Sequence, residues 1–501
     1  MSGLEDKAEE QRLEKGKIRK LLFLIGLLLC TILLAADIVT ILNVVRLNVL
    51  SGKLLALLVT TLIFILVILV VLNRWIVSGI VSKVLSLCLI VLLIIANRYM
   101  QYTYNRLNYM TDIKTIIDDM HVYVMEDDSA RSVQDAEAYT FGRLSTLDKN
   151  NTDTYIASIE DVLGVKIECR EYEAAVDLVK ALYDGEVGAI IMNSAYTGIV
   201  TGVDEFKDFE RDTRIIDTLS IENEVCIDEE VNEAYLYNGD RVFTIYISGI
   251  DTRGSSPKVN SNSDVNILLT ANLDTRQVLL ISTPRDFYVP LSISNGIRDK
   301  LTHAGGYGID VSMDTLEMLY GVNIDDYLKI NFTGFVDVID ELGGVEVYSD
   351  YDFSTKKNSF RKGYNSLNGE EALAFARERY SFSDGDRQRG KNQMAVIEAI
   401  IKKMASSDML ENYTDILDSL ADCIVTSMTH DEITELVKFQ LNDMSGWDVQ
   451  KYSVNGFDSS NTTYSAGSMV LYVMVPDDET VEQAKEYLRQ IYAGKTVQVK
   501  K

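Results

Sequence analysis

Charged side chains stand at the ends of apolar segments in the second half of the chain. Asp251 follows the segment 242–249 closely, and Asp264 comes directly before the segment 265–273. If these strands lie side by side, the two carboxylates meet at one edge of the sheet. Two carboxylates facing phosphate oxygens suit Mg²⁺, because this ion is hard and keeps several waters. An aspartate at a strand end is also a common turn former, so the pair alone leaves both interpretations open.

Arg285 follows a third apolar segment, in the sequence ISTPRDFYVP at residues 281–290. Two prolines bracket Arg285 and Asp286, and a proline fixes its φ angle and lacks the N–H that a strand interior needs. The segment therefore predicts a rigid turn at the tip of a strand, with Arg285 displayed on it.

Arg377 and Arg379 are two residues apart in the sequence FARERY. On a helix this spacing puts the side chains on different faces, whereas in an extended segment it puts them on one face. The helix that starts near Asn368 is therefore expected to stop near Ala376. Paired guanidiniums suit phosphate, because each offers a planar fork of donors and stays charged. A solvated helix end is the alternative interpretation.

Two further segments bring polar side chains to the same region. Arg389 and Gln393 are four residues apart, which places them on one face of a helix expected over about 386–405. Lys300 and His303 precede a glycine-rich stretch that could wrap a phosphate or form a hinge, although it matches neither the Walker A nor the dinucleotide pattern. His303 is either a base or a structural hydrogen-bonding group.

The composition argues against several other chemistries. The chain has three histidines and five scattered cysteines, with no CxxC, HExxH or GxSxG, so zinc and a histidine-based triad are not expected. Residues 1–98 hold 11 basic and 6 acidic residues, whereas the rest holds 37 and 69, a net charge of −32. Nucleic-acid binding depends on neutralising phosphates with Lys and Arg, so no nucleic-acid partner is expected. Any anion must be held by a local cluster of cations.

Three apolar segments near the N-terminus predict membrane spans. Residues 54–72 carry no charge over 19 residues, and a helix of this length, rising about 1.5 Å per residue, crosses a hydrocarbon core of about 30 Å. Segments 21–45 and 75–96 contain only Asp37 and Lys83 as charges. Basic residues before the first span predict a cytoplasmic tail, so three crossings place the later residues outside. Asp37 is either functional or near the outer mouth of its span.

The rest of the chain predicts two α/β parts. Between residues 115 and 235, segments 121–125 and 187–193 are expected strands and 173–185 an amphipathic helix. From residue 242, strands and helices interleave, which predicts a layered α/β domain. Besides the segments named above, the expected elements are a strand at 277–283, a helix at 312–320, a strand at 327–331, a helix at 333–342 and a strand at 345–348.

Five of these segments together resemble a known family. STPRD, DKLTHA, INFTGFVDVIDELGGVEV, LNGEEALAFARERY and GDRQRGKNQ occur in this order. The chain resembles the LytR-CpsA-Psr family of cell-wall ligases, strongly over 242–405 and more weakly to about 495. Three spans with an accessory domain are similar to its capsule-type subgroup.

The resemblance implies an α/β fold in five parts. These are a cytoplasmic tail (1–20), three transmembrane helices (21–98), a small extracellular α/β accessory domain (99–237), an α/β/α layered catalytic domain with a mixed central sheet (238–495) and a C-terminal tail (496–501).

The resemblance also implies an activity. Family members transfer a glycopolymer, capsular or teichoic-acid-like, from a polyprenyl-pyrophosphate carrier to peptidoglycan outside the membrane and form a phosphodiester. The implied partners are the lipid-linked glycan, the peptidoglycan acceptor, the membrane of a Gram-positive-type envelope and candidate capsule-assembly proteins. A polyprenyl-pyrophosphate hydrolase with the same site and a non-catalytic membrane regulator of envelope polymer synthesis are the alternatives.

The family's roles carry over onto matching positions. Asp251 and Asp264 would hold Mg²⁺, and Asp264 would share the catalytic role with Arg285, Arg377 and Arg379. The pyrophosphate would be bound by Arg285, Lys300, Arg377, Arg379, Arg389 and Gln393. An apolar tunnel for the lipid could be lined by Leu316, Phe335 and Ile339, which would serve equally as ordinary core. Many relatives carry Arg-Gln where this chain has Asn392-Gln393, so one guanidinium is missing. Asp286 and Asp264 are the candidates for the base that activates the acceptor.

Overall fold

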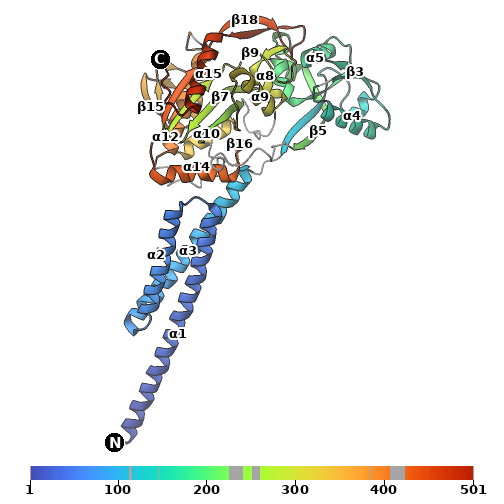
Figure 1. Cartoon of the computed structure of the whole chain (residues 1–501). Coiled ribbons are helices and arrows are strands. Elements are labelled where there is room, and N and C mark those ends of the chain that lie inside the picture. The colour runs from blue at the N-terminus through green and yellow to red at the C-terminus, as the bar shows by residue number, and fades with distance from the viewer. Residues whose placement is uncertain are drawn as a thin grey trace. The chain divides into compact units, whose positions relative to one another are not determined.

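A computed structural model of the chain describes residues 2–111, 115–145, 147–224, 241–250, 260–383, 385–406 and 424–499 (Figure 1). Contacts between residues divide the chain into two units. The first consists of Met1–Tyr109 and Thr429–Met444, and the second of Met110–Met428 and Ser445–Lys501. Asp251 falls outside the described residues.

The first unit contains the long helices α1 (Ser2–Leu47), α2 (Gly52–Leu72) and α3 (Ile76–Thr111) together with α14 (His430–Asp443). Within the first three, the segments Gly16–Leu47, Gly52–Leu72 and Gly79–Asn108 are long and apolar enough to cross a membrane. The prediction of three apolar helices at the N-terminus is therefore confirmed.

Polar side chains within this unit bond to one another rather than to lipid. Asn43 donates from Nδ2 to Oδ1 of Asn97 at 2.7 Å, and Asn97 donates to Oγ1 of Thr40 at 2.9 Å. Lys83 donates from Nζ to Oδ1 of Asn73 at 2.9 Å. Such bonds satisfy groups that would otherwise face an apolar environment. Asp37 is likewise buried.

The second unit begins with a sheet of five described strands in the order β3-β2-β4-β1-β5. These strands are β1 (Thr115–Met125), β2 (Thr140–Leu144), β3 (Glu168–Tyr172), β4 (Ala189–Asn193) and β5 (Thr213–Glu224). Its helices are α4 (Lys149–Leu163), α5 (Ala175–Tyr183), α6 (Thr197–Thr201) and α7 (Phe209–Asp212). This is the small α/β part expected before residue 237.

Six described strands then form the central sheet, in the order β16-β11-β6-β7-β8-β17. They are β6 (Val242–Ile250), β7 (Ser263–Asn272), β8 (Gln277–Ser282), β11 (Asp326–Asn331), β16 (Ile424–Thr426) and β17 (Asp448–Ser453). The β6–β7, β7–β8 and β11–β16 pairs are antiparallel, whereas β6–β11 and β8–β17 are parallel. The sheet is therefore mixed, as expected.

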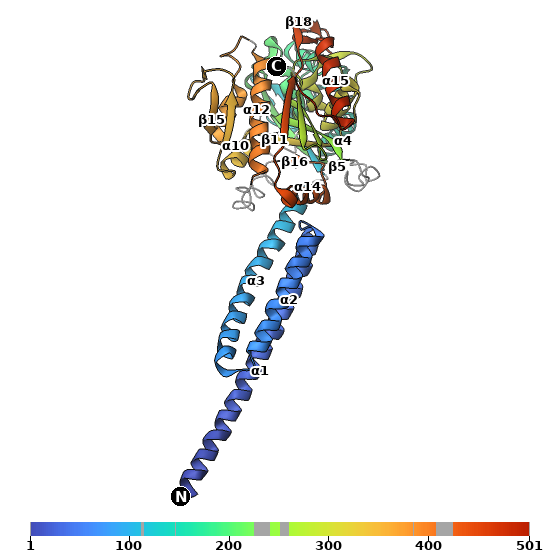
Figure 2. The same ribbon diagram turned by 60° about the vertical axis from the view of Figure 1, so that its left-hand side comes forward.

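Helices cover both faces of this sheet, and Figure 2 shows α12 and α15 on opposite sides of it. Ile281 packs into one buried cluster with Leu316 and Leu488. The next residue, Ser282, faces α12, because successive strand residues point to opposite faces. One side carries α8 (Leu301–Tyr307), α9 (Ile309–Tyr320) and α15 (Asp478–Tyr492), and the other carries α12 (Asp386–Met404) with α10 (Phe332–Glu341) and α11 (Gly369–Arg377).

Short strands complete the second unit. A two-stranded sheet of β12 (Val345–Ser349) and β15 (Gly363–Leu367) packs against α12, and β13 (Phe353–Ser354) pairs with β14 (Ser359–Phe360). β9 (Tyr288–Pro290) pairs with β10 (Arg298–Lys300), and β18 (Gly456–Thr462) pairs with β19 (Val470–Pro476).

The glycine-rich stretch after His303 is helical rather than a loop or a hinge. It forms most of α8. A Cβ atom on Gly305 would lie 2.6 Å from the carbonyl oxygen of Ser261 and 2.9 Å from the nitrogen of Ser263. The glycine therefore lets the helix approach the start of β7, and this packing outweighs the low helix propensity of glycine.

Candidate functional site

Arg285 and Asp264 meet where β7 begins and β8 ends. In the antiparallel register, Ile267 lies opposite Ser282, so the residues three positions beyond on each strand come together. Nη1 of Arg285 donates to Oδ1 of Asp264 at 2.9 Å, and the two side chains are 26% and 19% exposed. The arginine lies at the strand tip, as the proline-bracketed turn predicted, and it stands beside a carboxylate.

Asp286 links two cations. Its Oδ2 lies 3.5 Å from Nε of Arg285, and its Oδ1 lies 3.0 Å from Nζ of Lys300. Lys300 reaches this position because β10 pairs with β9, which places it opposite Tyr288. The aromatic ring of Tyr472 lies 5.8 Å from Nζ of Lys300 on the other side. Asp286, whose role the sequence left open, orients the neighbouring cations.

Helix α12 adds Arg389 to the same place. Nη2 of Arg389 lies 2.8 Å from Oδ1 of Asp386 and donates to the backbone oxygen of Asp264 at 3.5 Å. The helix approaches β8 closely, because a Cβ atom on Gly390 would lie 2.5 Å from Oγ of Ser282. Gln393, one turn further along the helix, lines a small cavity with Arg285 and Arg389.

Arg377 and Arg379, at the end of α11, contact different neighbours. Helix α11 includes Arg377, one residue beyond the expected stop, and Glu378 is extended with φ −67° and ψ 128°. Arg379 donates to the hydroxyl of Tyr380 at 2.8 Å. Burial raises the pKa of Asp386, and the charge of Arg379 opposes this rise, less strongly than Arg389 and Arg285 do. The guanidinium of Arg377 instead lies 4.1 Å from the ring centre of Phe332. We call Arg285, Lys300, Arg379 and Arg389, with Asp264, Asp286 and Asp386, the cation cluster.

The pKa values in the cation cluster reflect burial and paired charge. Burial lowers the pKa of the Arg285 guanidinium, but Asp264 and Asp286 outweigh burial and raise that pKa above its usual range. Burial raises the pKa of Asp386 more than Arg389 and Arg285 lower it. Burial also lowers the pKa of Arg389, where the attraction of Asp386 compensates only in part. Four cations against three carboxylates leave the cluster suited to an added anion.

The other predicted residues lie elsewhere. Leu316 belongs to the buried cluster under α9 and α15, whereas Ile339 and the partly buried Phe335 belong to the cluster of α10, α11 and α12, so the three do not line one cavity together.

His303 is 3% exposed, and its Nδ1 lies 2.7 Å from Oδ1 of Asp299 and 2.8 Å from Oγ of Ser465, which favours the structural role.

Asn392 has a packing role. Its Nδ2 donates to the backbone oxygen of Phe375 at 3.2 Å, and its Oδ1 accepts from Gln388 at 2.9 Å. Both amides are buried. Asn392, where the family resemblance implied an arginine, therefore helps to join α11 to α12 in this chain.

Sequence reasoning missed Asp386 and Tyr472. Asp386 stands three residues before Arg389 on one helix, a spacing at which side chains are neighbours, so the sequence held a signal for it. Tyr472 comes from β19, far from the motifs, and the sequence held no comparable signal for it.

Residues that could hold a metal are only partly described. Oδ1 of Asp264 accepts from Arg285, and within the described residues Oδ2 has no hydrogen-bond or ion-pair partner. Across those same residues, no group of three His, Cys, Asp or Glu side chains lies close enough to hold a metal ion. Mg²⁺ is often bound by one or two carboxylates together with substrate phosphates, so Asp264 fits such a role.

The sequence of the second unit matches a known family of proteins. The LytR_cpsA_psr family model matches residues 196–489, and the chain therefore belongs to the LytR-CpsA-Psr family. The expectation from the five sequence segments is confirmed.

Two known transferases are similar in sequence to part of the chain. The polyisoprenyl-teichoic acid–peptidoglycan teichoic acid transferase TagU of Bacillus cereus is 36% identical over 196 residues, which is 39% of this chain and 63% of the relative. The protein of the same name from Enterococcus faecalis is 34% identical over 200 residues, 40% of this chain and 66% of the relative. The chain thus spans just under two thirds of the length of both.

Solved structures are also similar. The crystal structure of B. subtilis TagV is 28% identical, with a TM-score of 0.42, and the match covers 51% of this chain and 99% of that one. A structure described as TagT bound to LI-WTA is 29% identical, with a TM-score of 0.41, over 51% of this chain and 92% of that one.

The ion pairs of Arg285 lead us to expect that replacing this residue lowers the stability of the protein. In Arg285→Met, the carboxylates of Asp264 and Asp286 lose their shared counter-charge. Removing one partner of a fully buried pair costs about 3–5 kcal/mol, and the partial exposure here reduces the expected loss to about 1–2 kcal/mol. The midpoint of thermal unfolding in detergent should fall, and the added change Asp264→Asn should restore part of it. Arg361→Met, at an exposed arginine, is the control, and equal midpoints for the two single variants would contradict the account.

Proposed function

We propose that this protein is a phosphotransferase that moves a glycopolymer from a polyprenyl-pyrophosphate carrier to peptidoglycan outside the cell membrane. The observation that carries the proposal is the cation cluster, which gathers four positive side chains in an acidic domain. A pyrophosphate concentrates negative charge, and a local excess of fixed cations is what binds it.

The relatives support the class of substrate. Two of them are named as transferases that join teichoic acid from a polyisoprenyl carrier to peptidoglycan. A teichoic-acid-like polymer is therefore the first candidate for this chain, and a capsular polysaccharide, with capsule-assembly proteins as partners, is the second. The three apolar helices suit a substrate with a lipid anchor, and an odd number of crossings after a basic tail supports a location of the cation cluster outside the membrane.

The cation cluster would act by positioning and charge stabilisation. An acceptor hydroxyl attacks the glycan-bearing phosphorus, a new P–O bond forms, and the bridging P–O bond of the pyrophosphate breaks to release polyprenyl phosphate. Negative charge grows on the released phosphate as this bond breaks, and Arg285, Arg389 and Arg379 lie where they can offset it. The hydroxyl proton leaves to a base, for which Asp264 and Asp286 are the candidates.

We also propose Mg²⁺ as a cofactor, held by Asp264 and Asp251. The ion would neutralise part of the charge on the pyrophosphate oxygens. The position of Asp264 supports this assignment, because its carboxylate lies at the strand edge beside Arg285 and is 19% exposed.

Chelation tests the cofactor. Transfer by the full-length protein should fall to background in EDTA and return on addition of Mg²⁺. Asp264→Asn should need a higher Mg²⁺ concentration for half-maximal rate, because it removes one ligand charge. Undiminished transfer in EDTA would remove Mg²⁺ from the proposal.

Substitution of Arg377 and Arg379, at the end of α11, tests the transfer site. Arg379→Ala should lower transfer about 10²–10³-fold, since one preorganised donor in such a site is worth about 3–4 kcal/mol. Arg377→Ala should also lower transfer if substrate draws its guanidinium from Phe332. Neither side chain is buried, so thermal unfolding should stay as in wild type. The assay is conversion of a lipid-linked glycan in the presence of peptidoglycan, with Arg361→Ala as the control.

The products separate the proposal from its alternatives. A transferase yields glycan joined to peptidoglycan, a hydrolase yields only free glycan phosphate even with acceptor present, and a regulator yields neither. Wild-type turnover in Arg379→Ala would remove this residue from the site.

A further inference from the structure

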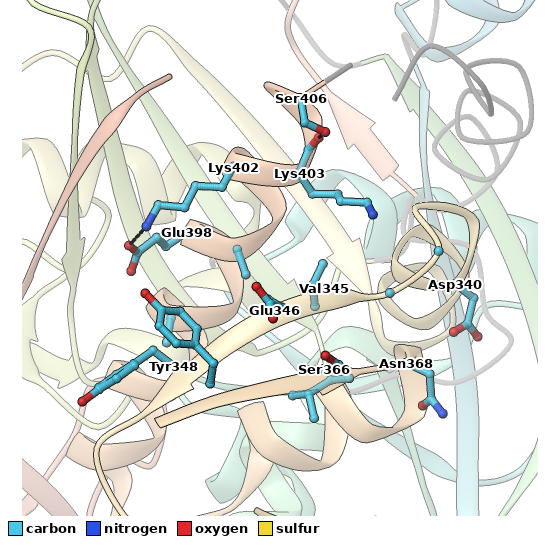
Figure 3. A pocket seen from close by; sticks show the side chains of 16 residues that line it. Asp340, Val345, Glu346, Tyr348, Ser366, Asn368, Glu398, Lys402, Lys403 and Ser406 are labelled. Atoms are coloured by element: carbon cyan, nitrogen blue, oxygen red, sulfur yellow. Dashed lines mark hydrogen bonds and ion pairs between the residues drawn. The ribbon is translucent and has the colours of Figure 1, made fainter. Parts of the chain in front are cut away.

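A cavity of about 800 Å³ lies between α12 and the two-stranded sheet of β12 and β15 (Figure 3). It shares none of its lining residues with the cation cluster. Its size falls within the range of small-molecule sites, which is about 300–1,000 Å³. Its walls combine two tyrosines, acidic and basic side chains, and a few apolar groups.

Two tyrosines form an exposed aromatic platform in this cavity. Tyr348 and Tyr364 lie directly opposite each other in the antiparallel register, with ring centres 5.2 Å apart at 76°. They are 43% and 69% exposed. Strand pairing fixes the backbone from which both rings project, and a tyrosine offers an apolar face with a polar tip. Sugar rings have the complementary character, with apolar C–H faces and hydroxyl edges.

Hydrogen-bonding groups stand on the same face of the sheet. Glu346 and Ser366 are opposite each other, two residues from the tyrosines, so all four side chains share one face. The intervening residue Val347 is fully buried on the other face. Figure 3 shows the carboxylate of Glu346 directed into the cavity, and it forms no hydrogen bond or ion pair with another described residue.

Ion pairs fix the wall formed by α12. Glu398 lies 2.6 Å from Nζ of Lys402 and 2.5 Å from Nζ of Lys451. Burial raises the pKa of Glu398, but these lysines outweigh burial and lower that pKa, so the carboxylate stays charged. The wall is therefore rigid before any ligand arrives, which reduces the entropy lost on binding.

The charges of the cavity balance. Asp340, Glu346 and Glu398 are offset by Lys402 and Lys403 in the lining and by Lys451 on Glu398. A polyanion gains no net attraction from such a surface. The cation cluster, with its surplus of positive charge, differs in this respect. An uncharged ligand with hydroxyl and amide groups fits the cavity better.

We propose that this cavity binds an uncharged glycan of N-acetylated hexosamine units, the glycan backbone of the acceptor. The identity of the glycan as acceptor rests on the proposed transferase function. The aromatic platform stacks on the sugar faces, while Glu346 and the polar groups of the α12 wall bond to the hydroxyls and amides. The cavity would thereby hold the acceptor at a second place besides the reacting hydroxyl.

Calorimetric titration tests the proposal without the reaction. The full-length protein in detergent, with no lipid-linked donor, is titrated with a β-1,4-linked hexamer of N-acetylglucosamine. Binding should be saturable, at least tenfold weaker in Tyr364→Ala and weaker in Glu346→Ala. Tyr364→Phe keeps the ring and should bind within about threefold of wild type, which is less than 1 kcal/mol. Tyr351→Ala is the matched control, because Tyr351 is exposed but does not line the cavity.

Three results would overturn the proposal. The first is that the wild-type protein shows no saturable binding of the hexamer. The second is that wild type and Tyr364→Ala bind the hexamer with equal affinity. The third is that the protein binds a polyglycerol phosphate more tightly than the uncharged hexamer. The titration needs no turnover, so it is separate from the proposed function. Glycan binding by a protein that transfers nothing would contradict the transferase, whereas transfer without any effect of Tyr364→Ala on binding would contradict only the cavity.

Discussion

The structure of the site depends on carboxylates that hold cations together. Arg285, Lys300, Arg389 and Arg379 would repel one another at close range in a partly buried place. Asp264, Asp286 and Asp386 each contact at least one of the first three, which offsets the repulsion and fixes the side chains. The domain is acidic overall, yet at this edge of the sheet its acids serve to organise a positive site.

The backbone makes this arrangement possible in two ways. The antiparallel register of β7 and β8 brings Asp264 to Arg285 without any long-range coincidence. Gly390 lets α12 approach β8, so that Arg389 reaches the backbone of Asp264. Arg377, which is exposed, and Arg379, which is partly buried, contact Phe332 and Tyr380 instead.

The sequence predicted the strands and the strand-tip arginine well, because apolar runs and prolines are local signals. It also predicted the end of α11 within one residue, but the expectation that Arg377 and Arg379 share one face was wrong, because Arg377 contacts Phe332 and Arg379 donates to Tyr380. It failed where packing decides. The stretch after His303 is a helix because Gly305 fits against β7, and the apolar pattern showed that Leu316 and Ile339 are buried but not that they belong to separate clusters. Tyr472 became visible only in the structure, because it comes from β19, far from the motifs.

The central claim is that the cation cluster holds the pyrophosphate of a lipid carrier. Mass spectrometry of lipids that remain bound after purification in mild detergent tests it most directly. Wild type and Arg361→Ala should retain a polyprenyl phosphate or pyrophosphate, and Arg379→Ala should retain at least tenfold less. The account is contradicted if wild type carries no such lipid, or if Arg379→Ala carries as much as wild type.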